Sequence, residues 1–287
     1  MSTNKQRREA ARRKLERQLQ ARVARERRRK RTLTVLTAVG IVVVVAVVSA
    51  FIAVSNNGGK KKNKAGSSSS SSGVAALPSR PPAKITRTTP KSTTGPCKYK
   101  ETAAGLKSGN LFDVGLPPDP KTTPTATRTA TFTTNQGVIT VDLDGKNAPC
   151  NVQSIVYLIG KKFYDNTACP RSVNSGIFVV QCGDPSGTTG GGPTYTVKDE
   201  SLKTAKYPAG VLAMANSGAN TNGSQFFFIT KDSTSGLGSP GKYTVIGKIT
   251  KGLDIVQKIA AGGDDESNQA GGGRPNIDLI FKTVTVK

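Results

Sequence analysis

The sequence predicts a mainly β domain, an antiparallel barrel or sandwich, preceded by one transmembrane helix and a disordered linker. Three observations predict this arrangement. An uncharged apolar run lies near the N-terminus, a run of serines follows it, and the rest of the 287-residue chain alternates short apolar segments with turn residues. Many short strands with few helices favour a barrel or sandwich over a layered α/β fold.

Most of the net charge of +24 lies outside the expected domain. Residues 1–31 carry 14 Lys or Arg and 3 Glu, and residues 32–101 carry 10 Lys or Arg and one Glu, which leaves +4 for residues 102–287. The domain itself is therefore only mildly basic. We expect no nucleic-acid-binding face on it.

Residues 1–32 are predicted to form a basic cytoplasmic tail. Its first 31 residues contain no Gly or Pro and are rich in helix-forming residues. Each Lys or Arg close to an anionic bilayer contributes about 1 kcal/mol, so anionic lipid headgroups are the expected partner. RNA binding is the alternative interpretation of the same charges.

Residues 33–54 are predicted to form a membrane helix, because they carry no charge and are rich in valine. At about 1.5 Å per residue they reach roughly 33 Å, enough for a hydrocarbon core of about 30 Å. A cleaved signal peptide is the alternative, suggested by Ala53-Val54-Ser55, but the apolar run and the preceding tail are long for one. The basic flank predicts a single-pass protein of the cell membrane with its C-terminal domain outside the cytoplasm.

Residues 55–95 read as a disordered linker, and residues 96–287 as the folded domain. The linker contains a lysine cluster, six consecutive serines and several prolines, a composition that cannot bury a core. The first strands expected in this domain are two alternating segments over residues 128–143, joined at Asn135-Gln136-Gly137. The further expected elements are helices over 151–161 and 252–261, and strands around 169–173, 177–182, 210–215, 224–230, 243–249 and 277–286.

The chain contains no histidine and no tryptophan. Without histidine, a Ser-His-Asp triad, a Cys-His pair or a histidine-containing zinc site cannot form. The four cysteines, Cys97, Cys150, Cys169 and Cys182, contain no C-x₂-C pair, so we expect neither a metal nor a cofactor. Outside the cytoplasm they would form disulfides, with three complete pairings possible. Strand alternation turns Cys169 and Cys182 apart if Arg171 and Gln181 share a face, and the pairing stays open.

Three stretches together resemble the cyclophilin family of peptidyl-prolyl cis–trans isomerases. They are FVVQCGDPSGTTGGGPTYTVKDE at 178–200, YPAGVLAMANSGANTNGSQFFFIT at 207–230 and YTVIGKITKGLDIVQKIA at 243–260. The resemblance covers residues 128–287, and its middle block matches the family's M-A-N-x-G-x-N-T-N-G-S-Q-F-F pattern almost continuously. Residues 97–102 and 111–120 resemble the extension of secreted or membrane-anchored actinobacterial members. The fold implied is an eight-stranded antiparallel barrel closed by two helices.

The resemblance also implies an active-site face. The residues implied for catalysis are Arg171, Gln181, Phe178 and Asn216. Those implied for substrate binding are Val179, Ala215, Gln225, Phe227, Leu237 and Tyr243. The sequence departs from the family's pattern at four points: Pro170 precedes the arginine, Val179 replaces Met, Tyr243 replaces His, and the pocket tryptophan is missing. The missing tryptophan implies weak binding of cyclosporin-like ligands.

Arg171 is a candidate catalytic residue independently of the resemblance, because it is the only arginine between Arg128 and Arg274. An X-Pro bond rotates over a barrier of about 18–20 kcal/mol as amide resonance is lost, and no nucleophile, metal or cofactor is needed. A fixed guanidinium can stabilise the twisted amide. The sequence therefore predicts an isomerase acting on proline-containing polypeptides outside the cytoplasm. The alternative is a non-catalytic chaperone or adaptor that only binds proline peptides.

Overall fold

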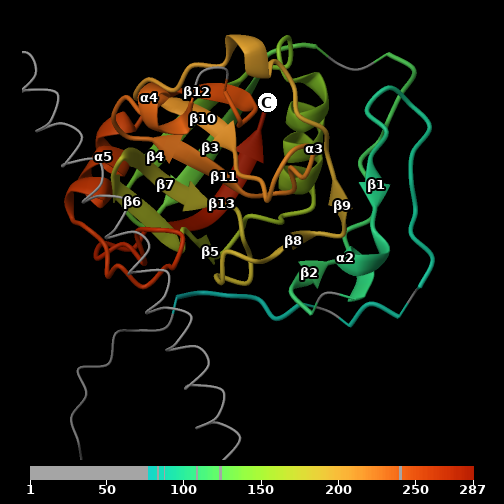
Figure 1. Cartoon of the computed structure of the whole chain (residues 1–287), viewed down its shortest axis with the longest axis horizontal. Coiled ribbons are helices and arrows are strands. Elements are labelled where there is room, and N and C mark those ends of the chain that lie inside the picture. Colours follow the sequence, from blue (N-terminus) through green and yellow to red (C-terminus); the bar gives the residue numbers. More distant parts are fainter. Residues whose placement is uncertain (1–76, 83, 87, 108, 123–124, 239–240) are drawn as a thin grey trace, which may run out of the picture. The chain divides into compact units, whose positions relative to one another are not determined.

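The centre of the molecule is one antiparallel sheet (Figure 1). The computed structural model describes residues 77–287, apart from residues 83, 87, 108, 123–124 and 239–240. The sheet has nine strands in the order β5-β13-β3-β4-β12-β10-β11-β7-β6. These strands are β3 (Arg128–Thr134), β4 (Val138–Leu143), β5 (Thr167–Ala168), β6 (Arg171–Ser175), β7 (Ile177–Cys182), β10 (Val211–Met214), β11 (Phe226–Ile229), β12 (Val245–Lys251) and β13 (Ile280–Val286).

The two edge strands of the sheet, β5 and β6, are separated in the chain only by Cys169 and Pro170. β5 pairs with β13 and β6 pairs with β7, so the sheet curves back on itself. Pro170 interrupts the strand because proline has no backbone N–H to donate to a ladder. Counting β5 and β6 as one interrupted strand gives the eight strands that the resemblance implies.

Two helices pack against this sheet, as expected. α3 (Pro149–Gly160) contacts β13, and α5 (Leu253–Ala261) contacts β6 and β7, so the helices lie on opposite sides in Figure 1. The Glu200 carboxylate accepts hydrogen bonds from the Cys150 and Asn151 amides at the start of α3. This acidic residue therefore caps the helix N-terminus. The shorter elements are α2 (Ala103–Lys107), α4 (Thr234–Leu237) and a 3₁₀ turn (Leu202–Thr204).

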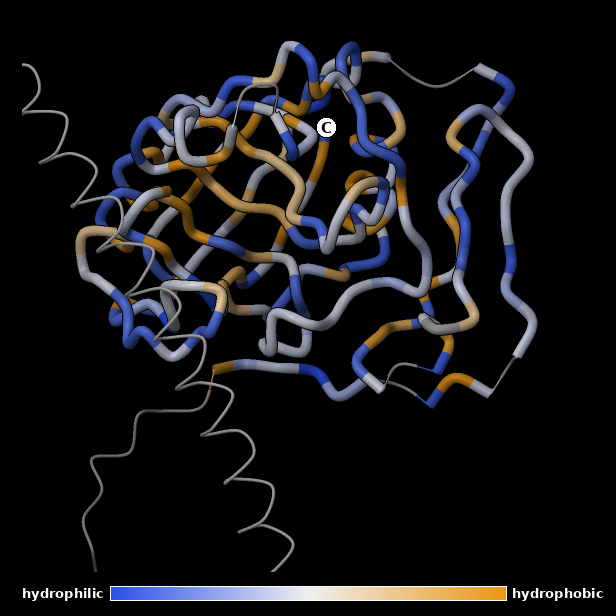
Figure 2. Tube along the Cα trace, in the orientation of Figure 1, coloured by the Kyte–Doolittle hydropathy of each residue, from blue (hydrophilic) through white to orange (hydrophobic). Residues whose placement is uncertain are grey.

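The strands separate two apolar clusters by alternation. In β11, Phe226 and Phe228 belong to the interior cluster, which also receives the buried faces of α3 and α5. Phe227 and Ile229 point to the opposite side, into a smaller cluster. Figure 2 shows the corresponding concentration of hydrophobic residues on the central strands and of hydrophilic residues on the surrounding loops. The strand period of two thus divides the domain between a structural core and a second apolar face.

The predicted hairpin over residues 128–143 is confirmed. β3 and β4 pair from Arg128 and Leu143 to Thr133 and Val138, and the Thr134 amide donates to the Gly137 carbonyl across the turn. Gly137 has a φ of +131°, which a residue with a side chain rarely adopts.

Residues before the hairpin form an extension on the domain. Its strands β1 (Lys100–Glu101) and β2 (Leu111–Phe112) pair with β9 (Tyr195–Thr196) and β8 (Gly192–Pro193), respectively. The Cys97–Cys150 disulfide ties this extension to α3. The Tyr99 hydroxyl donates to the Cys150 carbonyl at 2.9 Å. The extension is therefore fixed to the strand segments that precede β10.

The packed part of the chain begins earlier than residue 96, where the sequence placed the domain boundary. Arg80 donates hydrogen bonds from its backbone to Pro185 and from its guanidinium to Phe163. The same guanidinium carbon lies 5.7 Å from the ring centroids of both Phe112 and Phe163. Burial lowers the pKa of Arg80, while Asp165 raises it. Arg80, which belongs to the expected linker, is thus held on the domain surface.

The predicted tail over residues 1–32 and membrane helix over residues 33–54 lie outside the described residues. Among the residues that are described, no helix has the length and apolar character needed to cross a bilayer.

The structure pairs Cys97 with Cys150 and Cys169 with Cys182. The expectation that Cys169 and Cys182 point apart is wrong. It treated Cys169 and Arg171 as residues of one regular strand, but the interruption at Pro170 breaks the alternation between them. Cys169 joins Cys182 in the interior cluster, whereas Arg171 faces the other side of the sheet.

Removing the Cys97–Cys150 disulfide should cost more stability than removing the Cys169–Cys182 disulfide. The sequence separations are 53 and 13 residues, and a cross-link that closes a longer loop restricts the unfolded chain more. Loop-closure entropy gives about 4 and about 3 kcal/mol, respectively. Urea unfolding of the two double Cys→Ala variants checks the order. Equal losses, or the reverse order, would contradict it.

Candidate active site

A hollow of about 370 Å³ lies on the side of the sheet opposite the interior cluster. Residues from β6, β7, β11 and α4 line it together with residues from loops. The structure brings together here eight of the ten residues that the sequence placed in the site. These are Arg171, Val179, Gln181, Ala215, Asn216, Phe227, Leu237 and Tyr243.

The Arg171 guanidinium is fixed by three hydrogen bonds. Its Nη1 donates to Oε1 of Gln181 at 2.9 Å, its Nε to the Gly271 carbonyl at 2.9 Å and its Nη2 to the Ala270 carbonyl at 3.0 Å. A guanidinium has five N–H donors, so one remains on each terminal nitrogen for a ligand in the hollow. The side chain is half-buried, and an arginine held in this way is preorganised rather than mobile.

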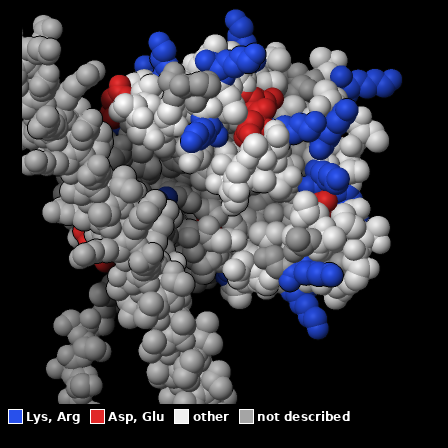
Figure 3. Space-filling model, viewed as in Figure 1, with Lys and Arg blue, Asp and Glu red and all other residues white. Residues whose placement is uncertain are grey.

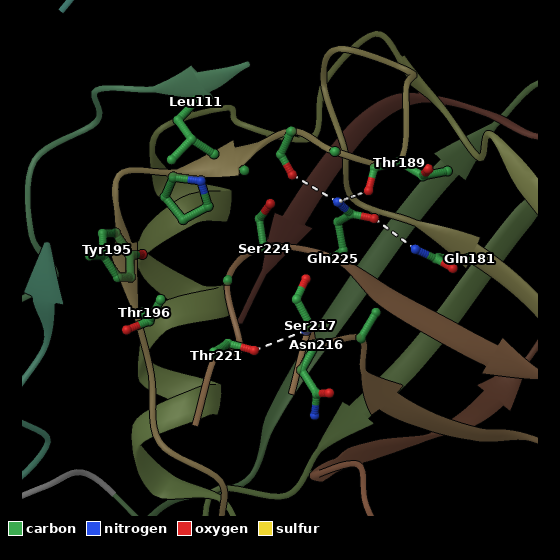
Figure 4. A pocket seen from close by; sticks show the side chains of 16 residues that line it. Leu111, Gln181, Thr189, Tyr195, Thr196, Asn216, Ser217, Thr221, Ser224 and Gln225 are labelled. Atoms are coloured by element: carbon green, nitrogen blue, oxygen red, sulfur yellow. Dashed lines mark hydrogen bonds between the residues drawn. The ribbon is translucent and has the colours of Figure 1, made fainter. Parts of the chain in front are cut away.

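Gln181 connects Arg171 to the loop beyond β7. Arg171 and Gln181 are direct cross-strand partners in the β6–β7 ladder. Nε2 of Gln181 then donates to Oε1 of Gln225 at 2.7 Å, and Nε2 of Gln225 donates to the Thr189 and Gly191 carbonyls (Figure 4). Because each amide is used on both sides, the relay fixes the orientation of both glutamines.

The glycine-rich loop after β7 is itself organised by a buried carboxylate. Asp184 accepts hydrogen bonds from the Ser186, Thr188 and Gly191 amides. A Cβ on Gly191 would lie 2.1 Å from Oδ1 of Asp184, so only glycine fits there. The loop therefore serves as a rigid acceptor for Gln225.

A second loop holds the other side of the guanidinium. The two carbonyls that accept from Arg171 belong to Ala270 and Gly271, and Gly271 and Gly272 have φ values of +94° and +70°. Gly272 approaches Ser172 so closely that a Cβ would lie 1.9 Å from the Ser172 carbonyl oxygen. The sequence around Gly271 is rich in glycine, but no local pattern in it indicates a contact with the arginine.

The floor of the hollow is apolar. Val179, Phe227 and Leu237 are almost fully buried and belong to the second apolar cluster. The Phe227 ring meets the Tyr243 ring edge to face, with centroids 5.3 Å apart. The backbone of Tyr243 is held in turn by the hydroxyl of Tyr207. This floor is suited to an apolar ring of about the size of a proline side chain.

Ala215 and Asn216 form the rim opposite Arg171. The Asn216 side chain donates to the Lys242 carbonyl at 3.1 Å, and its Oδ1 accepts from the Gly218 amide. These bonds hold the residue at the mouth, where its backbone and amide lie beside any peptide in the hollow. A peptide backbone therefore finds polar groups on both rims of an apolar floor.

Gln225 and Phe178 are the two predicted residues that do not line the hollow. Gln225 reaches it through Gln181. Phe178 faces away, because Val179 and Gln181 face the hollow and successive strand residues point to opposite sides. Its ring lies under Nζ of Lys231, at 4.9 Å.

Four further residues line the hollow that the sequence did not predict. Ile177 lines the hollow in place of Phe178, and the period of two along β7 could have found it. Thr189 comes from the loop after β7. Asn268 and Ala270 come from the loop before β13, whose approach is a long-range contact without a local signal.

A neighbouring pocket of about 260 Å³ shares one wall with this hollow (Figure 4). The shared residues are Gln181, Thr189, Ala215 and Asn216. Leu111, from β2 of the extension, lines its far end. The two pockets therefore adjoin, and a residue outside the sheet lines the second one.

Charged side chains are spread over the face of the domain shown in Figure 3. On the face shown in Figure 3, Lys and Arg side chains lie along the rim, with Asp and Glu between them, and do not gather in one patch. In the described part of the chain, no group of three or more His, Cys, Asp or Glu side chains is placed to hold a metal ion. The distribution agrees with the mildly basic domain expected from the sequence.

The fold and the hollow define a barrel-like β protein with a groove for an apolar ring beside a peptide backbone. A model of the family "Cyclophilin type peptidyl-prolyl cis-trans isomerase/CLD" matches residues 129–284. The chain therefore belongs to the cyclophilin family.

Similar proteins and structures carry isomerase names. A probable peptidyl-prolyl cis-trans isomerase B of Mycobacterium leprae is 43% identical over 162 residues, 52% of each chain. A peptidyl-prolyl cis-trans isomerase-like 1 of Emericella nidulans is 41% identical over 133 residues, 45% of this chain and 79% of that protein. A crystal structure of a Cryptosporidium parvum cyclophilin matches with a TM-score of 0.50 at 28% identity, covering 56% of this chain and 98% of that one. The matches span about half the length of the mycobacterial relatives.

The absence of histidine and the burial of Arg171 together determine how the activity of this site should depend on pH. Burial lowers the pKa of Arg171, while Tyr243 and Asp264 raise it. A lowered pKa means that the proton is lost at a lower pH than in free arginine, but an arginine remains charged far above neutrality. An activity that depends on the charge of Arg171 should therefore stay constant between about pH 5.5 and 8.5. A bell-shaped pH profile of that activity in a folded sample would show that a group other than Arg171 controls it.

Proposed function

We propose that this chain is a peptidyl-prolyl cis–trans isomerase that accelerates rotation of X-Pro bonds in polypeptides folding outside the cytoplasm. The observation that carries the proposal is the Arg171 guanidinium, fixed by three hydrogen bonds beside the apolar floor of Val179 and Phe227. Family membership and the names of the relatives support the same reaction.

The mechanism needs only positioning and electrostatics. The floor holds the proline ring, and the polar rim at Asn216 holds the backbone on one side of the bond. As the bond twists, amide resonance is lost and the lone pair returns to the proline nitrogen. The remaining N–H donors of Arg171 favour this twisted state over either planar isomer, which is the condition for catalysis. A lowering of the barrier by about 7 kcal/mol would accelerate rotation roughly 10⁵-fold.

A peptidase-free assay tests the activity directly. The full-length chain is added to an Ala-Pro peptide, and exchange between the cis and trans forms is followed by NMR. Faster exchange that saturates with peptide supports the proposal. Binding of the peptide without faster exchange would refute it and identify a non-catalytic proline-binding module.

The proposal includes a membrane tether. It is supported by the uncharged residues 33–54 and by the basic residues before them, which favour a cytoplasmic N-terminus. Residues 1–32 would then lie against anionic lipid headgroups, and the isomerase domain would lie outside. The chain should remain in the membrane pellet after alkaline carbonate extraction, and protease added outside should degrade the domain. Release into the supernatant would overturn the tether without affecting the isomerase.

A further inference from the structure

One of the two disulfides lies directly beside the pair of side chains on which the proposed reaction depends. Cys169 precedes Arg171 by two residues, and Cys182 follows Gln181 immediately. Their Cα atoms are 4.1 Å apart, and both side chains are buried in the interior cluster. The disulfide thus joins the two strands at the end of the ladder where Arg171 and Gln181 pair.

The backbone pairing of β6 with β7 ends at Arg171 and Gln181, and the next residue of β6, Ser172, exchanges hydrogen bonds with Gly273 on its other side. Arg171 is the first residue of β6, and its partnership with Gln181 is the last pair of the β6–β7 ladder. Pro170 cannot donate a hydrogen bond, and on its other side Cys169 donates to Leu279 of the segment leading into β13 rather than to β7. The disulfide is therefore the link between the two strands just beyond the final pair.

The side chains of that pair form one end of a relay. Arg171 donates to Gln181, Gln181 to Gln225, and Gln225 to the loop carbonyls. A shift of β6 along β7 would change the first distance, 2.9 Å, and would move the guanidinium relative to the floor. Displacements of about 1 Å at a reacting centre can cost about 10²-fold in rate.

We propose that the Cys169–Cys182 disulfide is a positioning element of the active site, which holds Arg171 and Gln181 in register. This inference rests on the proposed isomerase function. The disulfide touches no substrate and acts through Arg171. Its loss should lower kcat about tenfold and leave KM nearly unchanged, because the arginine interacts most strongly with the twisted bond rather than with the bound peptide.

The chain offers a matched control in its other disulfide. Cys97–Cys150 ties the extension to α3 and packs with Tyr99 and Tyr195 in a separate cluster. Neither cysteine lines the hollow. Since this disulfide closes the longer loop, its removal should reduce stability more and activity less. If activity were lost only through a general loss of stability, removal of Cys97–Cys150 would reduce activity more than removal of Cys169–Cys182.

The experiment compares the full-length wild type with the double variants C169A/C182A and C97A/C150A. Assays are run at a temperature at which circular dichroism shows all three to be folded. We expect about a tenfold loss of kcat in C169A/C182A and less than a twofold loss in C97A/C150A. An inactive wild type would refute the proposed function. An active wild type with equal kcat in C169A/C182A would refute the positioning role alone.

A double-mutant cycle separates positioning from general loosening. If the disulfide acts through Arg171, removing it from an R171A background should change the residual activity by less than twofold. A further tenfold loss in that background would show that the disulfide acts elsewhere and would overturn the proposal.

Reduction provides a second measurement if C169A/C182A does not fold. The C97A/C150A variant retains only Cys169 and Cys182 as cysteines, so a dithiol such as dithiothreitol can act on this bond alone. The dithiol becomes a cyclic disulfide, and its two electrons and two protons convert the protein disulfide to two thiols, which a thiol-reactive dye counts. Activity should fall about tenfold as two thiols appear and circular dichroism stays constant. Unchanged activity with two thiols per chain would overturn the proposal.

Discussion

Replacement of Arg171 by alanine should reduce kcat/KM for an Ala-Pro peptide by about 10²–10³-fold, the usual cost of losing one preorganised donor to a transition state. The guanidinium reaches the hollow from β6 and donates to Gln181, Ala270 and Gly271, so its removal leaves an unfilled space at the rim and an intact floor. The assay of peptide exchange by NMR measures the loss. Peptide binding should weaken much less than turnover.

Two variants make this result specific. Arg171→Lys should also lose most of the activity, because an ammonium cannot donate to Gln181 and to both loop carbonyls while presenting donors to the substrate. Arg128→Ala is the matched control, since Arg128 is exposed at the start of β3 and does not line the hollow. Full activity in Arg171→Ala, or an equal loss in Arg128→Ala, would remove the basis of the proposed mechanism.

The sequence predicts those parts of the site that local periodicity and motif spacing determine. The hairpin at Gly137 follows from turn chemistry, and the side of the sheet that carries Val179 and Gln181 follows from the motif. Alternation applied to β11 separates Phe227 from its two neighbours, as the structure shows. The same rule applied to β7 would have replaced Phe178 with Ile177.

The remaining features depend on contacts between distant segments, which leave no periodic signal. The carbonyls that hold Arg171 come from a loop about 100 residues later in the chain. Arg80 contacts Phe163 across 83 residues, from a segment whose composition reads as linker. The disulfide pairing was open because one proline, Pro170, breaks the alternation on which the argument from strand faces relied.

Replacement of Phe132 by alanine should destabilise the domain by about 3–5 kcal/mol, the usual cost of removing a buried aromatic side chain. Phe132 is 1% exposed in the middle of β3. Its ring centroid lies 5.0 Å from that of Phe281, 5.8 Å from that of Phe226 and 5.9 Å from that of Phe228. No other single ring in the described residues is in contact with all three, so its loss opens a cavity at the centre of the barrel.

Because the interior cluster and the hollow lie on opposite sides of the sheet, we expect the loss of stability in Phe132→Ala to leave the catalytic rate nearly unchanged. Phe132 belongs to the interior cluster, whereas Phe227 and the floor of the hollow belong to the second cluster. We expect the melting temperature to fall by roughly 10 °C, at about 2–4 °C per kcal/mol for a domain of this size, with kcat/KM at 10 °C within twofold of the wild type. Val138→Ala, at a side chain that is 38% exposed, is the control and should change stability by less than about 0.5 kcal/mol. A Phe132→Ala protein that is folded at 10 °C but inactive would show that the hollow depends on the interior packing, because the strands would then transmit the core defect to the opposite face.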